Sequence, residues 1–285
     1  MSDPGGLRNI SDTAAWVAIY RAIESERPDA LFRDPLARRL AGERGEQIAK
    51  NMAFANKNAW SFVARTVVVD RHVAESVRQG ANMVVNLAAG LDTRPYRMTL
   101  PISLQWIEVD LPEMLKYKAD ALIGERPACA LERIPCDLAD SSARRDLFER
   151  LGARAKSVFV ITEGLLVYLT EDEVIAFADD LAQQRSFTWW VVDMVSPRLL
   201  RMLQAGMGSQ LGEAGAPLKF APEKGPGFFA QHGWKPVEAH SLLHEAARLK
   251  RLPLLRRPLA WLPDTRGTKP NQPWGGVCLL ARSTA

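Results

Sequence analysis

Acidic side chains follow three short apolar runs of the chain, and their type and placement could bind a ligand that carries positive charge. Asp110, Asp137 and Glu163 each come directly after such a run. If the runs are parallel strands of one sheet, the three carboxylates meet at its carboxyl edge, where open α/β sheets bind their ligands. Like charges this close need a cationic ligand or an arginine to offset them. We therefore expect a binding site for a cationic molecule at this edge.

A turn of small residues follows an earlier apolar run, in the sequence Asn86-Leu87-Ala88-Ala89-Gly90-Leu91-Asp92. Doubly wound sheets approach nucleotide-like ligands at such a turn. Two of the three glycines of the dinucleotide fingerprint are absent, and Asp92 puts a carboxylate where a pyrophosphate would need positive charge. Asp110, twenty residues after Gly90, stands where an acid reaches ribose hydroxyls. S-adenosylmethionine, which has a ribose and a sulfonium but no phosphate, fits this pattern better than NAD or ATP.

The central part of the chain alternates short apolar runs with helical stretches, which is typical of repeated βαβ units in a parallel sheet. The pattern predicts strands over 82–88, 104–109, 132–136, 157–162, 187–194, 236–242 and 276–282. Between and after them it predicts helices over 94–97, 111–124, 143–151, 171–184 and 243–251. We therefore expect an α/β fold with a seven-stranded, mostly parallel sheet.

Helical periodicity before the first strand predicts two domains or layers. Residues 1–58 are expected to form an N-terminal helical cap, and residues 59–285 the ligand-binding core, which opens with a long helix over 59–79. Residues 196–227, after the fifth strand, contain so many glycines and prolines that we expect no single packed element there. This insertion is predicted to be a mobile lid.

Composition and charge narrow the function classes. The chain has 285 residues, of which 47% are hydrophobic and 25% charged, and this excludes low-complexity disorder and collagen. The net charge of +4 is spread along the chain, which argues against a nucleic-acid track. Neither a membrane-length apolar run nor a secretory signal is evident, so we expect a cytoplasmic protein without a membrane partner. Cys129, Cys136 and Cys278 lack metal-ligand spacing and are predicted to be core hydrophobes, with no metal site.

Four motifs occur in order and at suitable intervals. They are FVART at 62–66, VNLAAGLDTR at 85–94, IEVDLP at 107–112 and ITEGLLVYL at 161–169. Together they resemble the leucine carboxyl methyltransferase family, in its bacterial branch of polyketide-type O-methyltransferases. The similarity extends to residues 27–35 and 227–234 and so covers most of residues 20–240.

This resemblance implies the class I methyltransferase (Rossmann-like) fold, with an antiparallel seventh strand, and S-adenosylmethionine as the cofactor. It implies that Arg65 binds the methionyl carboxylate and that Glu163 faces the ammonium. Asp110 with Leu111 would contact the ribose, and Asp137 with Leu138 the adenine. The resemblance also places Ala88 and Gly90 close to the cofactor, with Arg21 as a further basic contact. Because the family usually has glycine at the position of Ala88, the sign of φ there matters. We expect a negative φ, for which alanine is harmless.

The leading hypothesis is an S-adenosylmethionine-dependent O-methyltransferase that modifies a carboxylate or hydroxyl of a small, polyketide-type molecule. A carboxylate is already ionised at neutral pH and needs no general base, whereas a phenol would benefit from one. No histidine stands in an obvious base motif, which favours a carboxylate. The catalytic candidates are Tyr168, near the expected cleft, and His72, seven residues after Arg65 on one side of the helix over 59–79.

Four alternatives remain. One is a nicotinamide-dependent oxidoreductase on a Rossmann sheet, against which the poor glycine fingerprint and Asp92 argue. Another is a phenol or alcohol O-methyltransferase with a histidine base. The third, a nucleic-acid methyltransferase, is disfavoured because the Thr162-Glu163-Gly164-Leu165 segment lacks the motif for a flipped base. The last is a cofactor-binding subunit without turnover.

Overall fold

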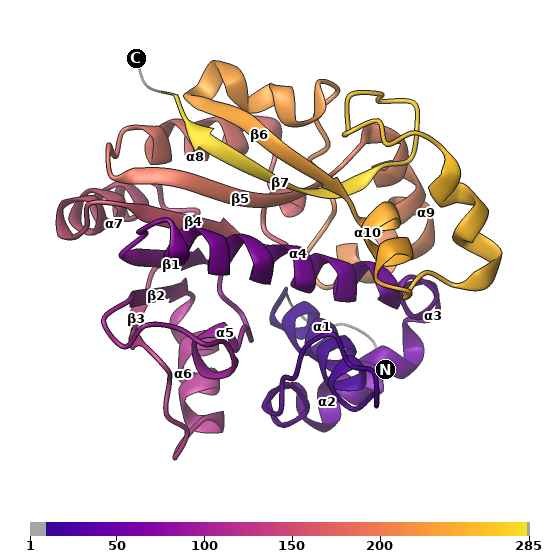
Figure 1. The fold of residues 1–285 in the computed structure, drawn as a ribbon, viewed down its shortest axis with the longest axis horizontal. Coiled ribbons are helices and arrows are strands. Elements are labelled where there is room, and N and C mark those ends of the chain that lie inside the picture. Colours follow the sequence, from indigo (N-terminus) through magenta and orange to yellow (C-terminus); the bar gives the residue numbers. More distant parts are fainter. Residues whose placement is uncertain (1–9, 284–285) are drawn as a thin grey trace.

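The computed structural model describes residues 10–283, and its central feature is one seven-stranded sheet with helices on both faces (Figure 1). The strands are β1 Met83–Leu87, β2 Gln105–Asp110, β3 Ala130–Pro135, β4 Val158–Thr162, β5 Phe187–Val195, β6 Trp234–Ser241 and β7 Gly275–Arg282. Their order is β3-β2-β1-β4-β5-β7-β6, in which the first five are parallel and β7 runs antiparallel to both of its neighbours. The predicted seven-stranded, mostly parallel sheet is confirmed.

The two central strands explain where a ligand can bind. Every residue of β1 and of β4 is buried, as expected for parallel strands that are covered on both faces. The chain leaves β1 toward β2 and β3 on one side, and continues from β4 to β5 on the other. The connections therefore diverge between β1 and β4, and a crevice opens outside their carboxyl ends.

Helices connect and cover the strands. Those of the N-terminal part are α1 Ile10–Ser25, α2 Ala37–Asn51, α3 Ala53–Asn56 and α4 Ala59–Arg78. Those of the sheet region are α5 Arg94–Arg97, α6 Pro112–Ala121, α7 Ser141–Arg154, α8 Glu171–Ala182, α9 Pro197–Glu213 and α10 Leu242–Arg248, with 3-10 turns η1 Leu166–Tyr168, η2 Gly225–His232 and η3 Leu254–Trp261. Among residues 10–283, no helix combines the length and apolar character needed to cross a membrane.

The N-terminal helices form a layer that packs over the turn after β1. α1 and α2 share an apolar cluster that includes Trp16, Ile19 and Leu40, and this cluster extends to Leu91 in the turn and Leu211 on α9. Figure 1 shows α1 and α2 side by side on the same side of α4. The predicted helices of this region are confirmed, and the layer covers the crevice end of the sheet.

The prediction for the segment 196–227 is wrong in one respect, because it contains a 17-residue packed helix, α9. The Ser196 side chain caps this helix by accepting a hydrogen bond from the backbone N–H of Leu199. A Cβ at Gly206 would lie 2.6 Å from the Phe54 ring, so glycine here permits close packing of α9 on α3. Gly206, one of the residues that suggested a broken segment, therefore serves helix packing.

The expectation of a negative φ at Ala88 is also wrong, since its φ is +55°. The chain reverses sharply after β1, and Gly90 two residues later has a φ of +46°. The turn is held by backbone hydrogen bonds from Ala89 to Val109 and from Asp92 to Ala89. Alanine in the left-handed region is strained, because its Cβ lies too close to the following carbonyl oxygen.

A buried ion pair fixes β2, the strand that ends in Asp110. Lys118 Nζ on α6 lies 2.8 Å from Glu108 Oε1, and both side chains are fully buried. Arg133 on β3 binds the other oxygen of Glu108 at 2.9 Å. These contacts hold β2, β3 and α6 together, so they set the position of Asp110 at the sheet edge.

The turn conformation makes a prediction for stability. We expect Ala88→Gly to raise the free energy of unfolding by about 0.5–1 kcal/mol, because relief of about 1–2 kcal/mol of left-handed strain exceeds the entropy that glycine adds to the unfolded chain, about 0.4–1 kcal/mol. Urea unfolding would measure this change. The neighbouring Ala89→Gly, at a position without positive φ, should destabilise the protein. Equal changes in unfolding free energy for Ala88→Gly and Ala89→Gly would contradict backbone strain at Ala88.

The buried pair makes a second prediction. Lys118→Met should lower the free energy of unfolding by about 3–5 kcal/mol, because the buried Glu108 would keep only Arg133 as its partner. Lys116→Met on the same helix is the matched control, since this side chain is 76% exposed and should change stability by less than about 0.5 kcal/mol. An equal loss of unfolding free energy in Lys118→Met and Lys116→Met would contradict a specific contribution of the buried pair.

Candidate active site

A large cavity opens at the carboxyl ends of β1, β2 and β4, where the sheet topology places a ligand crevice. Its volume is about 1580 Å³, above the range of about 300–1,000 Å³ that is usual for one small ligand. The turn 88–92 and the strand ends form one wall, and α9 with segments near the C-terminus forms the other. The cavity is large enough for a donor and an acceptor together.

The structure brings the predicted cofactor residues together in this cavity. All nine line it, namely Arg21, Arg65, Ala88, Gly90, Asp110, Leu111, Asp137, Leu138 and Glu163. Tyr168, one of the two catalytic candidates, lines it as well. Burial raises the pKa of the Tyr168 phenol, so this side chain is a neutral hydrogen-bonding group at neutral pH rather than a base.

Asp110 is held in one orientation by the backbone. Its Oδ2 accepts a hydrogen bond from the Gly90 N–H at 2.7 Å, and its Oδ1 accepts one from the Leu111 N–H at 2.8 Å. Burial raises the pKa of this carboxyl, against the opposing effect of the two hydrogen bonds. A carboxylate has about four acceptor positions, so Asp110 can still accept hydrogen bonds from two hydroxyls.

Glu163 has the arginine partners that the sequence analysis named as one way to offset clustered acids. Arg65 Nε lies 2.9 Å from one of its oxygens, and Arg94 Nη2 lies 2.8 Å from the other. Burial alone would raise the pKa of Glu163, but the two guanidinium groups lower it. Arg65 also pairs with Asp193 on β5 at 2.7 Å. The carboxyl edge of the sheet at Glu163 therefore carries ion pairs and not a row of bare carboxylates.

Arg94 connects this set to α4 and to the turn after β1. It pairs with Asp70 at 2.7 Å and with Asp92 at 3.0 Å, and its side chain is 3% exposed. Asn86 at the end of β1 donates a second hydrogen bond to Asp92 at 2.7 Å. Burial would raise the pKa of the Asp92 carboxyl, but the nearby cations hold it well below its usual range. Asp92 therefore anchors the turn.

The ion pairs continue from Asp70 into the N-terminal layer. Arg97 binds both oxygens of Asp70, at 2.7 and 2.8 Å, and lies 3.9 Å from Asp34. Arg21 on α1 pairs with Asp34 at 2.9 Å and donates a hydrogen bond to the Leu91 carbonyl at 2.5 Å. Arg21 thus fastens α1 to the turn after β1.

The connected set, which we call the arginine network, has nine members: Arg21, Arg65, Arg94, Arg97, Asp34, Asp70, Asp92, Glu163 and Asp193. Five carboxylates face four guanidinium groups, so one negative charge is left over. Asp110 adds another close by, at the same edge of the sheet. The cofactor wall of the cavity therefore favours a ligand with positive charge.

Asp137 and its neighbours form the far end of this wall, after β3. Asp137 Oδ1 accepts a hydrogen bond from the Ala139 N–H at 2.9 Å, and the Leu138 carbonyl accepts one from Arg144 at 2.7 Å. Cys136 packs against the central core cluster but is only partly buried and also lines the cavity, so its prediction as a core residue holds only in part. Cys129 and Cys278 are buried, as predicted.

The other half of the cavity is mainly apolar. Its wall consists of side chains from α9, the N-terminal helices and the segment after β6, namely Leu199, Met202, Leu203, Met207, Leu211, Phe54, Trp60, Phe62, Leu242, Leu243, Leu259 and Leu262. Arg256 lies over the Trp60 ring, at 5.9 Å from its centroid, and also lines the cavity. This half suits an apolar molecule that carries a polar or charged group.

His72, the second catalytic candidate, does not lie at the cavity. Its proposed catalytic role is therefore wrong. Arg65 and His72 share a side of α4 but are two helical turns, about 11 Å, apart. Arg65 therefore pairs with Asp193 on β5, whereas the His72 ring lies beside His240 on β6. Burial lowers the pKa of His72 to about 4, so its ring stays neutral.

His244 is the histidine that does line the cavity. Its Nε2 lies 2.8 Å from the Leu262 carbonyl, which can only accept, so Nε2 carries a proton and Nδ1 is the acceptor nitrogen of the neutral ring. Among the described residues, that Nδ1 has no hydrogen-bond partner, and it is hidden from solvent.

Sequence reasoning also missed Asp193 and Arg94. A single charged residue within the apolar run 187–195 was the available signal for Asp193.

Comparisons with known proteins agree with this geometry. The family model described as leucine carboxyl methyltransferase matches residues 14–182. A Streptomyces coelicolor protein, whose name provisionally assigns it to the S-adenosyl-L-methionine-dependent methyltransferases, is 31% identical over 88% of this chain and 90% of its own. A similarly named Streptomyces avermitilis protein is 31% identical over 82% of this chain and 86% of its own.

Two solved structures share the fold. A DUF574 family protein from Streptomyces avermitilis superposes with a TM-score of 0.60 at 13% identity, over 94% of this chain and 97% of that one. A protein from Thermobifida fusca, provisionally called a methyltransferase, has a TM-score of 0.60 at 15% identity, over 98% and 96% of the two chains. The fold is the α/β fold of class I methyltransferases. On the family match and the similarity to these relatives, the chain belongs to the leucine carboxyl methyltransferase family.

Proposed function

We propose that this protein is an O-methyltransferase that moves a methyl group from S-adenosylmethionine to a carboxylate on a small, largely apolar molecule. The observation that carries the proposal is the fixed Asp110 carboxylate beside the negatively charged arginine network, in one cavity with an apolar half. A phosphate-bearing cofactor would meet repulsion there, whereas a sulfonium nucleoside meets attraction. Membership of the methyltransferase family supports the same reaction.

The residues of the cofactor wall fit this group. When bound, S-adenosylmethionine supplies a reactive methyl group on a positively charged sulfur. Asp110 has acceptor positions left for ribose hydroxyls, and Asp137 with Leu138 borders the place for an adenine. Arg65 would bind the methionyl carboxylate as a third anionic partner beside Glu163 and Asp193. The excess negative charge of the network would favour the ammonium.

The residues of the acceptor half favour a carboxylate. An acceptor carboxylate is already ionised at neutral pH, so the protein needs to align it and exclude water, but not to remove a proton. Arg256 is placed to attract such an anion, and Tyr168 can donate a hydrogen bond to it. The leucine and methionine side chains of α9 would hold the apolar part of the molecule.

We also propose that residues 1–58 act as a cap and the segment 196–227 as a cover over the core, 59–285. Trp16 and Phe54 from the first region and Met207 from the second line the cavity and belong to one apolar cluster. Their role would be to exclude water from the methyl group in transit.

A hydroxyl acceptor is the second candidate, and His244 favours it. Its unprotonated Nδ1 could accept a proton from a phenol or alcohol. However, Nδ1 is hidden from solvent, so side chains around it would have to move before it could reach an acceptor. For this reason we place the carboxylate first.

Binding of the donor tests the first part of the proposal. We expect Asp110→Ala to weaken binding of S-adenosylhomocysteine by about 1–3 kcal/mol, since hydrogen bonds to a charged carboxylate would be lost. Isothermal titration calorimetry measures this effect. Asp120→Ala, an exposed carboxylate that pairs with Lys116 on α6, is the matched control and should leave affinity unchanged. Equal affinity in wild type and Asp110→Ala would refute the assignment.

The pH dependence of turnover tests the acceptor. With an apolar carboxylic acid as substrate, kcat/KM should show no ionisation of the acceptor or of a base between about pH 6 and 9. The measurement is the formation of S-adenosylhomocysteine when matched acids, phenols and alcohols are offered as acceptors. Transfer only to phenols or alcohols, with a rate that rises with pH and is lost in His244→Gln, would instead establish the second candidate.

A further inference from the structure

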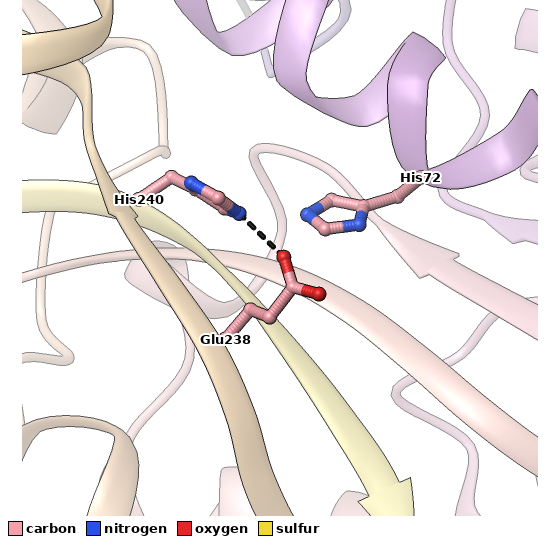
Figure 2. Close-up of side chains that lie close together, drawn as sticks. All are labelled: His72, Glu238 and His240. Atoms are coloured by element: carbon pink, nitrogen blue, oxygen red, sulfur yellow. Dashed lines mark hydrogen bonds and ion pairs between the residues drawn. The ribbon is translucent and has the colours of Figure 1, made fainter. Parts of the chain in front are cut away.

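Three potential metal ligands converge at a place outside the methyltransferase cavity. They are His72 on α4 and Glu238 and His240 on β6 (Figure 2). One ligand atom from each residue lies within 4.8 Å of the other two. Of these residues, none lines the cavity described above. The cluster therefore requires an explanation of its own.

The His72 ring has a nitrogen that lacks a hydrogen-bond partner. His72 is 5% exposed, and among the described residues its buried Nε2 contacts no donor or acceptor at hydrogen-bond distance. Figure 2 shows the ring with one nitrogen facing Glu238 and His240. Buried polar atoms are seldom left in this state, because the water they lose is not replaced. A bound cation in the cluster would provide the missing partner.

The surroundings of His240 resemble those of a metal-binding histidine. Its Nε2 lies 2.7 Å from Glu238 Oε2, and its Nδ1 lies 3.5 Å from Glu245 Oε1. Glu245 is itself held by Arg248 at 2.6 Å and by Arg71 at 3.4 Å. A carboxylate at the second ring nitrogen is the usual device that orients a ligating histidine and fixes its tautomer. It leaves Nε2 directed at the cluster.

We propose that His72, His240 and Glu238 bind a divalent transition-metal ion of the zinc class, with water in the remaining position. Two imidazole nitrogens and one carboxylate are a ligand set that such ions accept. Zinc–ligand bonds of about 2.0–2.2 Å require ligand atoms somewhat closer together than the 4.8 Å limit found here. Glu238 Oε2 already lies 2.7 Å from His240 Nε2, and the Glu238 side chain, which is 48% exposed, can shift toward His72 Nε2 when an ion binds.

The ion would join two parts of the chain that matter for the cavity. α4 carries Arg65, and β6 leads directly into α10, whose Leu242, Leu243 and His244 line the acceptor half. β6 is the edge strand of the sheet and has a register shift between Pro236 and Glu238. A metal link would hold this edge against α4 and so fix the acceptor wall. This role is structural and supplies no step of methyl transfer.

Titration of the full chain with zinc tests the proposal. After treatment with a chelator and its removal, the wild-type protein should bind one Zn²⁺ per chain by calorimetry. Glu238→Gln, His240→Gln and His72→Gln should each bind it about tenfold or more weakly. His232→Gln, which changes a histidine paired with Asp179 on α8, is the matched control and should bind Zn²⁺ like wild type.

Thermal unfolding supplies a second readout and a check on folding. At one Zn²⁺ concentration, the Tm of wild type and of His232→Gln should rise clearly more than that of Glu238→Gln or His240→Gln, whose partly exposed positions allow the variants to fold. The proposal is overturned if wild type binds no stoichiometric Zn²⁺, or if Glu238→Gln and His240→Gln bind it as tightly as wild type. Neither measurement depends on methyl transfer, so failure here leaves the proposed function untouched.

Discussion

A continuous run of ion pairs at the carboxyl edge of the sheet is the constraint on which the rest of the structure depends. It passes from Arg21 on α1 through Arg94 to Asp193 on β5. Because most of its members are nearly buried, loss of one would leave an uncompensated charge in a poorly solvated place, at a cost of about 3–5 kcal/mol. The run therefore fixes the N-terminal layer, α4, the turn after β1 and two strand ends relative to one another.

The same ion pairs explain how an acidic edge can exist before a ligand arrives. Bare carboxylates at neighbouring strand ends would repel one another and take up protons. The guanidinium groups of Arg65 and Arg94 prevent this at Glu163, whereas at Asp110 two backbone N–H groups oppose the rise in pKa that burial causes. The result is a rigid wall with an excess of negative charge, one from the arginine network and one from Asp110. Such a wall can attract a cation without reorganisation, which keeps the cost of binding low.

The sequence predicted those features that are set by local pattern. Alternating apolar runs located all seven strands, and the position directly after a strand identified Asp110, Asp137 and Glu163. What it could not predict depends on tertiary packing. The positive φ of Ala88 arises from a chain reversal, and α9 tolerates glycine because Phe54 occupies the space of a Cβ. The metal cluster joins residues more than 160 positions apart in the chain, so no spacing rule could have indicated it.

The two walls of the cavity differ in a way that bears on specificity. The cofactor wall comes from strand ends and is fixed by ion pairs and backbone hydrogen bonds. The acceptor wall comes from the N-terminal helices, α9, α10 and η3, and most of its side chains are leucine and methionine, which adapt their shape more easily. Changes in the first wall would disturb folding and cofactor binding together. Changes at the partly exposed residues of the second wall would alter mainly the volume and shape of the apolar half of the cavity, so on the proposed function the choice of acceptor depends on this wall and the reaction on the sheet edge.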